Sequence, residues 1–371
     1  MEESQGFAPP GSPPGSPSSS SESATPPPPR PVSARFASDN TAGVHPAVLA
    51  AIAAANASTA PSYGLDAVTS RAVALLRAHF GTAVEVAFAL TGTAANIIAL
   101  AALLRPHEAA LCATTAHILT DEAGTPERFL GSKLVGIPTP DGRLTVPLLS
   151  AATWPPDDPH RPVPRAVSLA QPTELGTVYS LESLREIASW THANDMLLHV
   201  DGARLSNAAV SLDVDLSAFA ACGIDVLTFG GTKNGALGAE AVVFLNPSLA
   251  TPRHHLQKQA MQLTSKMRFV AAQLAALLED DLWRTNAKQA NTTASALSTA
   301  ASALPGVTMA HPTQSNAVFA TIPPESAAHL HETYAFEWHP PSSTARWMTA
   351  FDTTLSEVRA FADSLKSSLP D

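Results

Sequence analysis

Two stretches decide the fold: Leu-His-Val-Asp-Gly-Ala-Arg at residues 198–204 and Thr-Phe-Gly-Gly-Thr-Lys-Asn-Gly at residues 228–235. In each, a short apolar run that favours a buried strand leads to a residue able to carry chemistry, first Asp201 and then Lys233. Ligands of open parallel sheets collect at the carboxyl edge, where the strands end. The sequence therefore predicts that this carboxylate and this amine serve one site.

The order and spacing of the two stretches favour an enzyme that holds pyridoxal phosphate. In such an enzyme a carboxylate keeps the pyridine nitrogen protonated, so that the ring accepts electrons, and a lysine carries the cofactor covalently. The lysine motif is not a P-loop, because the Gly-x-x-x-x-Gly-Lys spacing is missing and Asn234 follows the lysine. Taken singly, Asp201 is compatible with a structural aspartate and Lys233 with a solvated turn residue.

Short apolar runs alternate with helix signals over most of the chain. Pro46 opens a predicted helix that reaches about residue 56, and Asp66 caps a second helix that Gly81 ends. Strands are predicted at residues 84–90, 109–114, 133–138, 166–170, 197–200, 225–229 and 240–245, and a further helix at 180–194. This alternation predicts an α/β fold, with a mostly parallel sheet covered on both faces.

The composition along the chain predicts three segments. Residues 1–34 form a tail rich in Pro and Ser that we expect to be disordered, because it has too little apolar surface to bury. Residues 35–250 form a large cofactor-binding domain and residues 251–371 a small C-terminal α+β domain. In the latter we expect one long helix over 252–283, strands near 307–311, 316–322 and 346–351, and a closing helix over 354–368.

Composition also excludes several classes of protein. The 371 residues contain 22 Lys and Arg against 32 Asp and Glu, a net charge of −10, which argues against nucleic-acid binding. The longest aliphatic run, residues 97–104, is far too short to span a membrane. Only two cysteines occur, which favours a reducing, cytoplasmic location. The histidines lack the clustered partners of a metal site, and no Gly-x-Ser-x-Gly elbow supports a hydrolase.

A third motif, Thr-Gly-Thr at residues 91–93, follows a predicted strand and starts a predicted helix. The backbone N–H groups at such a helix end, together with the hydroxyls, are suited to binding a phosphate. A plain turn with a hydroxyl cap is the alternative interpretation of the same residues.

Through these motifs the chain resembles the low-specificity L-threonine aldolase family, whose members are pyridoxal-phosphate enzymes of the aspartate-aminotransferase-like (type I) fold. The resemblance runs from about Phe36 to the C-terminus. It rests on Ala-Ser-Asp-Asn at 37–40, Tyr-Gly at 63–64, Thr-Gly-Thr-Ala-Ala-Asn at 91–96, the Asp201 block and the Lys233 motif.

The resemblance implies three sets of site residues. Catalytic roles are implied for Lys233 and His117, and we add Glu174, because the base that removes the hydroxyl proton is either His117 or a water held by it and Glu174. Cofactor contacts are implied for Gly92, Thr93, His117, Asp201, Arg204 and Lys233, with the His117 ring stacked on the cofactor and Arg204 at its phenolic oxygen. Substrate contacts are implied for Ser38, Arg268 and Arg346, since a guanidinium fixes a carboxylate in two places; a surface ion pair is the alternative role of Arg268.

One position departs from the family pattern. Many members carry a histidine near the place of Glu174, in Gln-Pro-Thr-Glu-Leu-Gly at residues 171–176, where it helps to bind the β-hydroxyl. A glutamate there is compatible with hydroxyl binding and equally with an ordinary loop, so the preferred β-side chain and stereochemistry stay open.

The activity that the resemblance implies is cleavage of 3-hydroxy-α-amino acids, such as L-threonine and L-allo-threonine, to glycine and an aldehyde. The alternatives are β-elimination, transamination, cleavage restricted to phenylserine-like substrates, and a non-catalytic protein that binds pyridoxal phosphate. His117 favours the aldolase, because aminotransferases more often stack a larger ring there. The family further implies a homotetramer, in which Tyr63 contacts the cofactor of the adjacent subunit.

Overall fold

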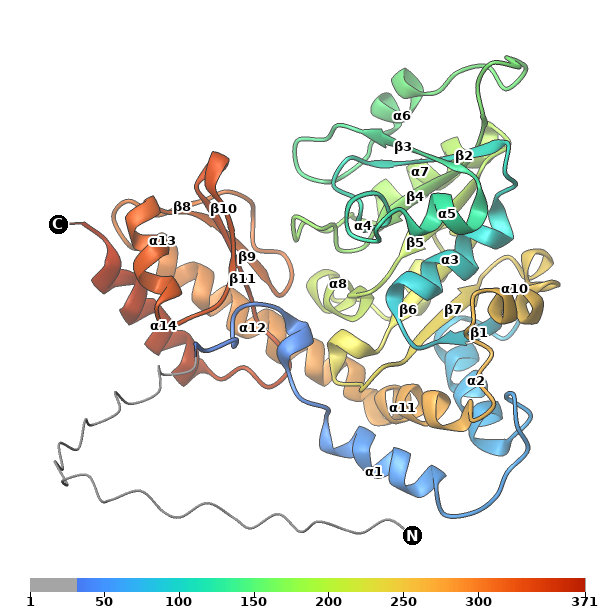
Figure 1. Cartoon of the computed structure of the whole chain (residues 1–371), viewed down its shortest axis with the longest axis horizontal. Helices are drawn as coiled ribbons and strands as arrows, with labels where there is room; N and C mark the ends of the chain where they lie inside the picture. The colour runs from blue at the N-terminus through green and yellow to red at the C-terminus, as the bar shows by residue number, and fades with distance from the viewer. Residues whose placement is uncertain (1–31, 371) are drawn as a thin grey trace, which may run out of the picture. The chain divides into compact units, whose positions relative to one another are not determined.

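The computed structural model of the chain describes residues 32–370, which form one compact unit (Figure 1). The predicted disorder of the tail therefore falls almost wholly outside the described residues. Ser33, which we placed in the tail, pairs with Tyr334 in an isolated β-bridge: its N–H donates to Thr333 and its carbonyl accepts from Ala335, both at 2.8 Å.

The larger sheet has seven strands in the order β1-β7-β6-β5-β4-β2-β3. Only β7 runs antiparallel to its neighbours, so the other six strands all end at the same edge. Their bounds are β1 Glu85–Ala89, β2 Glu108–Ala113, β3 Lys133–Ile137, β4 Val163–Ala170, β5 Leu197–Asp201, β6 Val226–Gly230 and β7 Glu240–Phe244. The predicted α/β class and the predicted strands are confirmed.

Helices cover this sheet on both faces because successive strand residues point to opposite sides. In β6, for example, Val226 packs into the apolar cluster under α3, while Leu227 packs into the cluster under α2, α7, α8 and α11. The helices are α1 Pro46–Ala55, α2 Ala67–Phe80, α3 Gly92–Leu103, α4 His117–Thr120, α5 Thr125–Leu130, α6 Val146–Ala152, α7 Leu181–Ala193, α8 Leu205–Leu212, α9 Ser217–Ala220, α10 Arg253–Gln259 and α11 Arg268–Leu278. Each fully buried aliphatic side chain contributes about 1.5–3 kcal/mol.

A second, antiparallel sheet of four strands follows in the order β10-β11-β9-β8. Trp347 of β11 and Phe361 of α14 are fully buried and lie with ring centroids 5.1 Å apart, in the centre of a separate apolar cluster. The elements are α12 Leu282–Ser302, β8 Thr308–Met309, β9 Ala317–Thr321, α13 Pro324–His331, β10 Glu337–His339, β11 Thr344–Met348 and α14 Leu355–Ser368. Figure 1 shows α12 running from the neighbourhood of α11 to this sheet.

The prediction of one long helix over residues 252–283 is wrong. The backbone is left-handed at Met261, with φ of 61°, and at Asp280 and Asp281, with φ of 51° and 52°. A left-handed residue cannot continue a right-handed helix, so α10, α11 and α12 are separate. The bounds of α12, which has 21 residues, and the short strand β10 were not predicted.

The division into domains at residues 250 and 251 stays a prediction. Within residues 32–370, no helix combines the length and the apolar character needed to cross a bilayer.

Candidate active site

Three loops meet where the parallel strands of the larger sheet end. Asp201 is the last residue of β5; Lys233 lies in the short 3-10 helix η2, Thr232–Asn234, after β6; and Gly92 begins α3 after β1. All three line one cavity, the inner hollow. An outer cavity of about 270 Å³ adjoins it. The residues that line both are His117, Pro172, Thr173, Glu174, Arg204 and Lys233. The carboxyl edge of the sheet therefore gathers most of the residues that the motifs singled out.

Close backbone contact between the ends of β5 and β6 holds Asp201 and Lys233 in register. The N–H of Gly230 donates to the carbonyl of Gly202 at 3.1 Å. A Cβ on Gly202 would lie 2.1 Å from the Thr228 carbonyl oxygen, and one on Gly230 would lie 2.3 Å from that of Ala203. Only glycine allows the two strand ends to approach this closely.

Asp201 is a buried carboxylate that stays charged. Its exposed fraction is 9%, and burial works against the charge. Hydrogen bonds from the Asn96 side chain, at 2.8 Å, and from the Ala203 N–H, at 2.9 Å, outweigh burial and hold the pKa of Asp201 below its ordinary value. Asp201 is therefore an anion able to hold a proton on a ring nitrogen.

Lys233 is an amine in a cationic neighbourhood. The charge of Arg204 and then burial lower the pKa of Lys233, against the opposing effect of Asp39 and Asp201. A lysine whose pKa is lowered is more often neutral at physiological pH and so more nucleophilic. These are the properties that covalent attachment to an aldehyde requires.

His117 is the first residue of α4, and its ring is tied to a buried glutamate. His117 Nδ1 lies 2.9 Å from Oε1 of Glu122, whose side chain is fully buried. This hydrogen bond raises the pKa of His117. The same Glu122 oxygen accepts from Asn96 at 2.9 Å, and Asn96 also donates to Asp201. A continuous chain of polar contacts thus joins His117 to Asp201.

Glu122 and Asn96 were not among the predicted site residues. Asn96 ends the quoted Thr-Gly-Thr-Ala-Ala-Asn motif, four positions after Gly92, and Glu122 follows His117 by five positions. The available signal for Asn96 was its place one helical turn after Gly92, and for Glu122 only its nearness in sequence to His117; nothing in the sequence showed that the amide and the carboxylate touch.

Glu174 lies in the loop after β4, against the start of α4. Its Oε1 accepts the backbone N–H of His117 at 2.9 Å. Burial raises the pKa of Glu174 to about 7, although the hydrogen bond from His117 opposes the shift. Glu174 can therefore take up or give off a proton near neutrality, and it lines both hollows.

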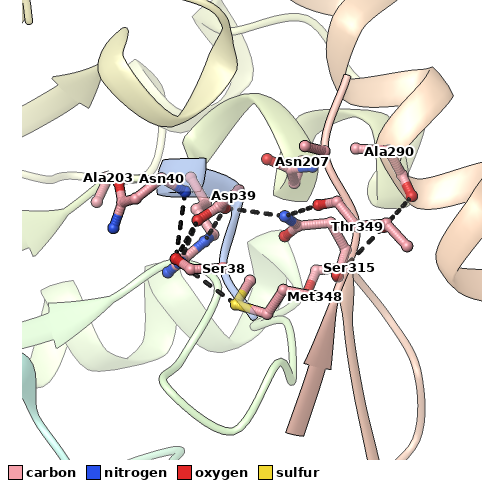
Figure 2. A network of polar contacts seen from close by, with 12 residues as sticks. Ser38, Asp39, Asn40, Ala203, Asn207, Ala290, Ser315, Met348 and Thr349 are labelled. Atoms are coloured by element: carbon pink, nitrogen blue, oxygen red, sulfur yellow. Dashed lines mark hydrogen bonds and ion pairs between the residues drawn. The ribbon is translucent and has the colours of Figure 1, made fainter. Parts of the chain in front are cut away.

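Arg204, in the turn between β5 and α8, is held by a carboxylate that the motifs did not single out as a site residue. Nε and Nη2 of Arg204 donate to the two carboxylate oxygens of Asp39 at 2.6 and 2.8 Å. Figure 2 shows Asp39 at the centre of this network, between Ser38 and Asn40 on one side and Thr349 on the other. Arg204 lines both hollows.

The small sheet contributes Arg346 to the outer cavity. Arg346 Nη2 donates to Glu337, which lies in the paired strand β10. The Glu337 side chain is largely exposed. The Nε of Arg346 is buried and has no hydrogen-bond partner among residues 32–370. Ser38 lines the same cavity, so two of the three predicted substrate residues lie there.

The third, Arg268, lies elsewhere in the chain. At the start of α11, its Nε donates to the carbonyl of Ala55 at 3.1 Å and its guanidinium lies 4.7 Å from the Phe269 ring centroid. It lines neither hollow. A role for Arg268 in substrate binding remains a prediction.

The phosphate site predicted from Thr-Gly-Thr lies at the start of α3 and remains a prediction. The Thr91 hydroxyl caps the helix by accepting the N–H of Ala94 at 3.2 Å. The first N–H groups of a helix have no partner inside it, so those of Gly92 and Thr93 remain available to an anion. Gly92 lines the inner hollow, and Thr93 follows it in the first turn. Across residues 32–370, no group of three or more His, Cys, Asp or Glu could hold a metal ion.

Comparisons with known proteins agree with this geometry. Residues 35–323 match the family described as Beta-eliminating lyase. A low specificity L-threonine aldolase of Pseudomonas aeruginosa is 41% identical over 335 residues, which are 90% of this chain and 97% of that protein. A solved Leishmania major threonine aldolase superposes with a TM-score of 0.84 at 30% identity, covering 91% of this chain and 99% of that one.

The fold is also that of the aminotransferases. A solved aspartate aminotransferase mutant of Thermus thermophilus superposes with a TM-score of 0.67, over 91% of this chain and 92% of that one, at 14% identity. Fold and site together define a lyase built on the type I fold of pyridoxal-phosphate enzymes. Within that class, the chain belongs to the low-specificity L-threonine aldolase family.

Proposed function

We propose that this protein is a pyridoxal-phosphate-dependent aldolase that cleaves L-threonine and L-allo-threonine to glycine and acetaldehyde. The observation that carries the proposal is that one cavity brings together a lysine, an ionised aspartate and a glutamate–histidine pair. The names of the relatives from Pseudomonas aeruginosa and Leishmania major support the choice of substrate.

The residues of the cavity fit pyridoxal phosphate. Lys233 would hold its aldehyde carbon, Asp201 its protonated ring nitrogen, and the N–H groups of Gly92 and Thr93 its phosphate. His117, at the cavity wall, would lie against the ring, and Arg204 would meet the phenolic oxygen. When bound, the cofactor supplies an electron sink for the pair of electrons released by the breaking Cα–Cβ bond.

Arg346 is the group that we assign to the substrate carboxylate. It lines the outer cavity next to Ser38, and its bond to the exposed Glu337 is open to water and easily exchanged. Pairing of the guanidinium with the substrate carboxylate would fix the orientation of Cα, and therefore which bond of Cα lies perpendicular to the cofactor ring.

Glu174 is the group that we assign to the proton of the β-hydroxyl, acting directly or through one water that His117 also holds. Glu122 favours the protonated form of His117, which makes the imidazole the poorer acceptor near neutral pH. Glu174, with a pKa of about 7, is largely ionised just above neutrality and can accept that proton.

The direct test uses purified protein saturated with pyridoxal phosphate and measures acetaldehyde release from L-threonine and L-allo-threonine. We expect release from both. A protein that binds the cofactor but releases acetaldehyde from neither substrate would contradict the proposal, and benzaldehyde release from phenylserine would then indicate a bulkier β-substituent.

We expect a pH dependence that Glu174 sets. Because the carboxylate must be ionised to accept the proton, kcat/KM for L-threonine should rise as the pH passes upward through about 7. Glu174→Gln should remove this limb and lower kcat by about 100-fold or more at pH 8, as the loss of a general base does. A limb that persists in Glu174→Gln would instead identify His117 as the base.

We expect Arg346→Ala to act mainly on substrate binding. Loss of a hydrogen-bonded ion pair costs about 1.5–3 kcal/mol, which corresponds to a rise in KM of about 10- to 100-fold. Steady-state kinetics of Arg268→Ala provide the matched control, since that guanidinium lies outside both hollows; its KM should change by less than about threefold. The reverse order of effects would assign the carboxylate to Arg268.

We further propose that the protein is a cytoplasmic homotetramer, as the family resemblance implies. Tyr63, Leu65 and Met261 are exposed at 48%, 81% and 70%, and burying large apolar side chains against a second copy of the chain would favour association. Light scattering of the purified protein measures the assembly, and a monomeric mass would contradict it.

A further inference from the structure

Asp39 is a buried carboxylate that has no role in the proposed reaction. It begins the short helix η1, Asp39–Thr41, directly after Ser38, and its exposed fraction is 2%. A charge in such a place is stable only when hydrogen bonds and opposite charges surround it. Arg204 and Asn316 provide them, although they lie 165 and 277 positions away in the sequence.

The pairing between Asp39 and Arg204 is a fork, which fixes the plane of the guanidinium as well as its distance. Oδ2 of Asp39 accepts from Nε at 2.6 Å and Oδ1 accepts from Nη2 at 2.8 Å. Nη2 also lies 3.6 Å from the sulfur of Met348. Nη1 has no hydrogen-bond partner among residues 32–370, so it is the end of Arg204 left available to the cavity that Arg204 lines.

The same carboxylate ties Arg204 to the small sheet. Asn316, just before β9, donates from one Nδ2 to Asp39 at 2.9 Å and to the carbonyl of Thr349 at 2.8 Å. The Thr349 hydroxyl in turn donates to the carbonyl of Ala290 in α12 at 2.7 Å. Figure 2 shows these contacts as one network that links the segment around Asp39, the small sheet and α12.

We propose that Asp39 is a positioning residue, which aims Arg204 into the cofactor cavity and fastens it to the small sheet through Asn316. This rests on the proposed function, in that the cavity holds pyridoxal phosphate. Because Ser38 precedes Asp39 and lines the outer cavity, the same anchor sets the rim where the substrate carboxylate enters.

The charge balance at Lys233 supports this role. Arg204 is the largest influence that lowers the pKa of Lys233, and Asp39 opposes it. Burial works against the charge of Asp39, but Arg204 more than compensates and holds the pKa of Asp39 below its ordinary value. Other charges that face Arg204 are Asp201 and Glu174. Asp39 therefore holds the Arg204 guanidinium beside Lys233 and balances the positive charge of that guanidinium.

The test is a double-mutant cycle with Asp39→Asn, Arg204→Gln and the two combined. The dissociation constant of pyridoxal phosphate is measured by absorbance titration of the cofactor-free protein, with no substrate present. We expect each single variant to weaken binding by about tenfold or more and the double variant to be no weaker than either, because coupled partners are not additive. Binding by Asp39→Asn within twofold of wild type, or losses that multiply in the double variant, would overturn the proposal.

Asp225→Asn is the matched control. Asp225 is also a buried carboxylate with three partners, His192, Asn246 and the Leu198 N–H, but it precedes β6 at the opposite edge of the sheet. We expect this variant to lower the melting temperature without changing the dissociation constant. An equal loss of cofactor affinity in Asp225→Asn would show that destabilisation alone explains the effect of Asp39→Asn and would overturn the positioning role.

Asn316→Ala keeps the proposal testable if Asp39→Asn does not fold. It leaves the ion pair intact and removes only the link to the small sheet. We expect a higher KM for L-threonine, weaker cofactor binding and an unchanged kcat per bound cofactor; unchanged KM and affinity would overturn the link.

The wild-type protein separates this proposal from the proposed function. If it binds the cofactor but releases no acetaldehyde, the aldolase activity is contradicted and the cofactor affinities still test the role of Asp39. If it binds no cofactor, both proposals are overturned.

Discussion

Lys233→Ala protein is expected to release acetaldehyde from L-threonine at least about 1,000-fold more slowly than wild type, the scale seen when an enzyme loses its covalent group. Lys233 is the one lysine among residues 32–370 that lines either hollow, so no second amine can take its place. Loss of its amine should also abolish the yellow colour that covalently held pyridoxal phosphate gives.

The matched control for this variant is Lys366→Ala. Lys366 is an exposed residue of the last turn of α14 and lines neither hollow, so its removal changes a charge without touching the cavity. We expect its rate to stay within about twofold of wild type. Lys233→Ala protein that kept a tenth of the wild-type rate would contradict the attachment of the cofactor at this position.

Asp201→Asn is expected to lower kcat by about 100- to 1,000-fold, the cost of removing one well-placed charge from an active site. The amide keeps the size of the side chain but has no charge to hold the ring proton. It also turns an acceptor of the Asn96 hydrogen bond into a group with competing N–H donors. The measurement is kcat at saturating L-threonine, with cofactor content determined in the same sample.

Asp201→Glu separates the charge from the shape of this group. If the charge decides the rate, the glutamate variant should recover part of the lost kcat even though its longer side chain disturbs the bond to Asn96. A glutamate variant as slow as Asp201→Asn would indicate that the geometry of the Asn96 and Ala203 contacts matters more than the charge.

The sequence predicted those parts of the fold that depend on local chemistry. Pro46, Asp66 and Gly81 stand where α1 begins, where α2 is capped and where α2 ends. The interruptions of the 252–283 stretch escaped because left-handed backbone at Met261 and Asp280 has no reliable local signal in residues other than glycine. The extent of helix α12 was not predicted because its Thr, Ser and Asn residues have low helix propensities, and the helix gains stability from packing.

The candidate site divides in the same way. Asp201 and Lys233 were predictable because each ends an apolar run of recognisable length. Asn96 and Asp39, which hold Asp201 and Arg204 in place, were not predictable, because hydrogen bonds across 105 and 165 positions of sequence depend on the folded chain as a whole. Glu122 is only five positions from His117, but its contact with Asn96, 26 positions away, also depends on the fold. The resemblance to a family carried the residue roles that local chemistry could not.

The glycine contact between β5 and β6 has a consequence for protein engineering. A Cβ at Gly202 or Gly230 would lie 2.1 or 2.3 Å from a backbone carbonyl oxygen, so neither glycine can be replaced without moving the two strands apart. The exposed rim of the outer cavity, where Asn40 and Asp121 lie, has no such restriction. A randomised library aimed at new aldehydes should leave the strand ends untouched and place all its variation at that rim.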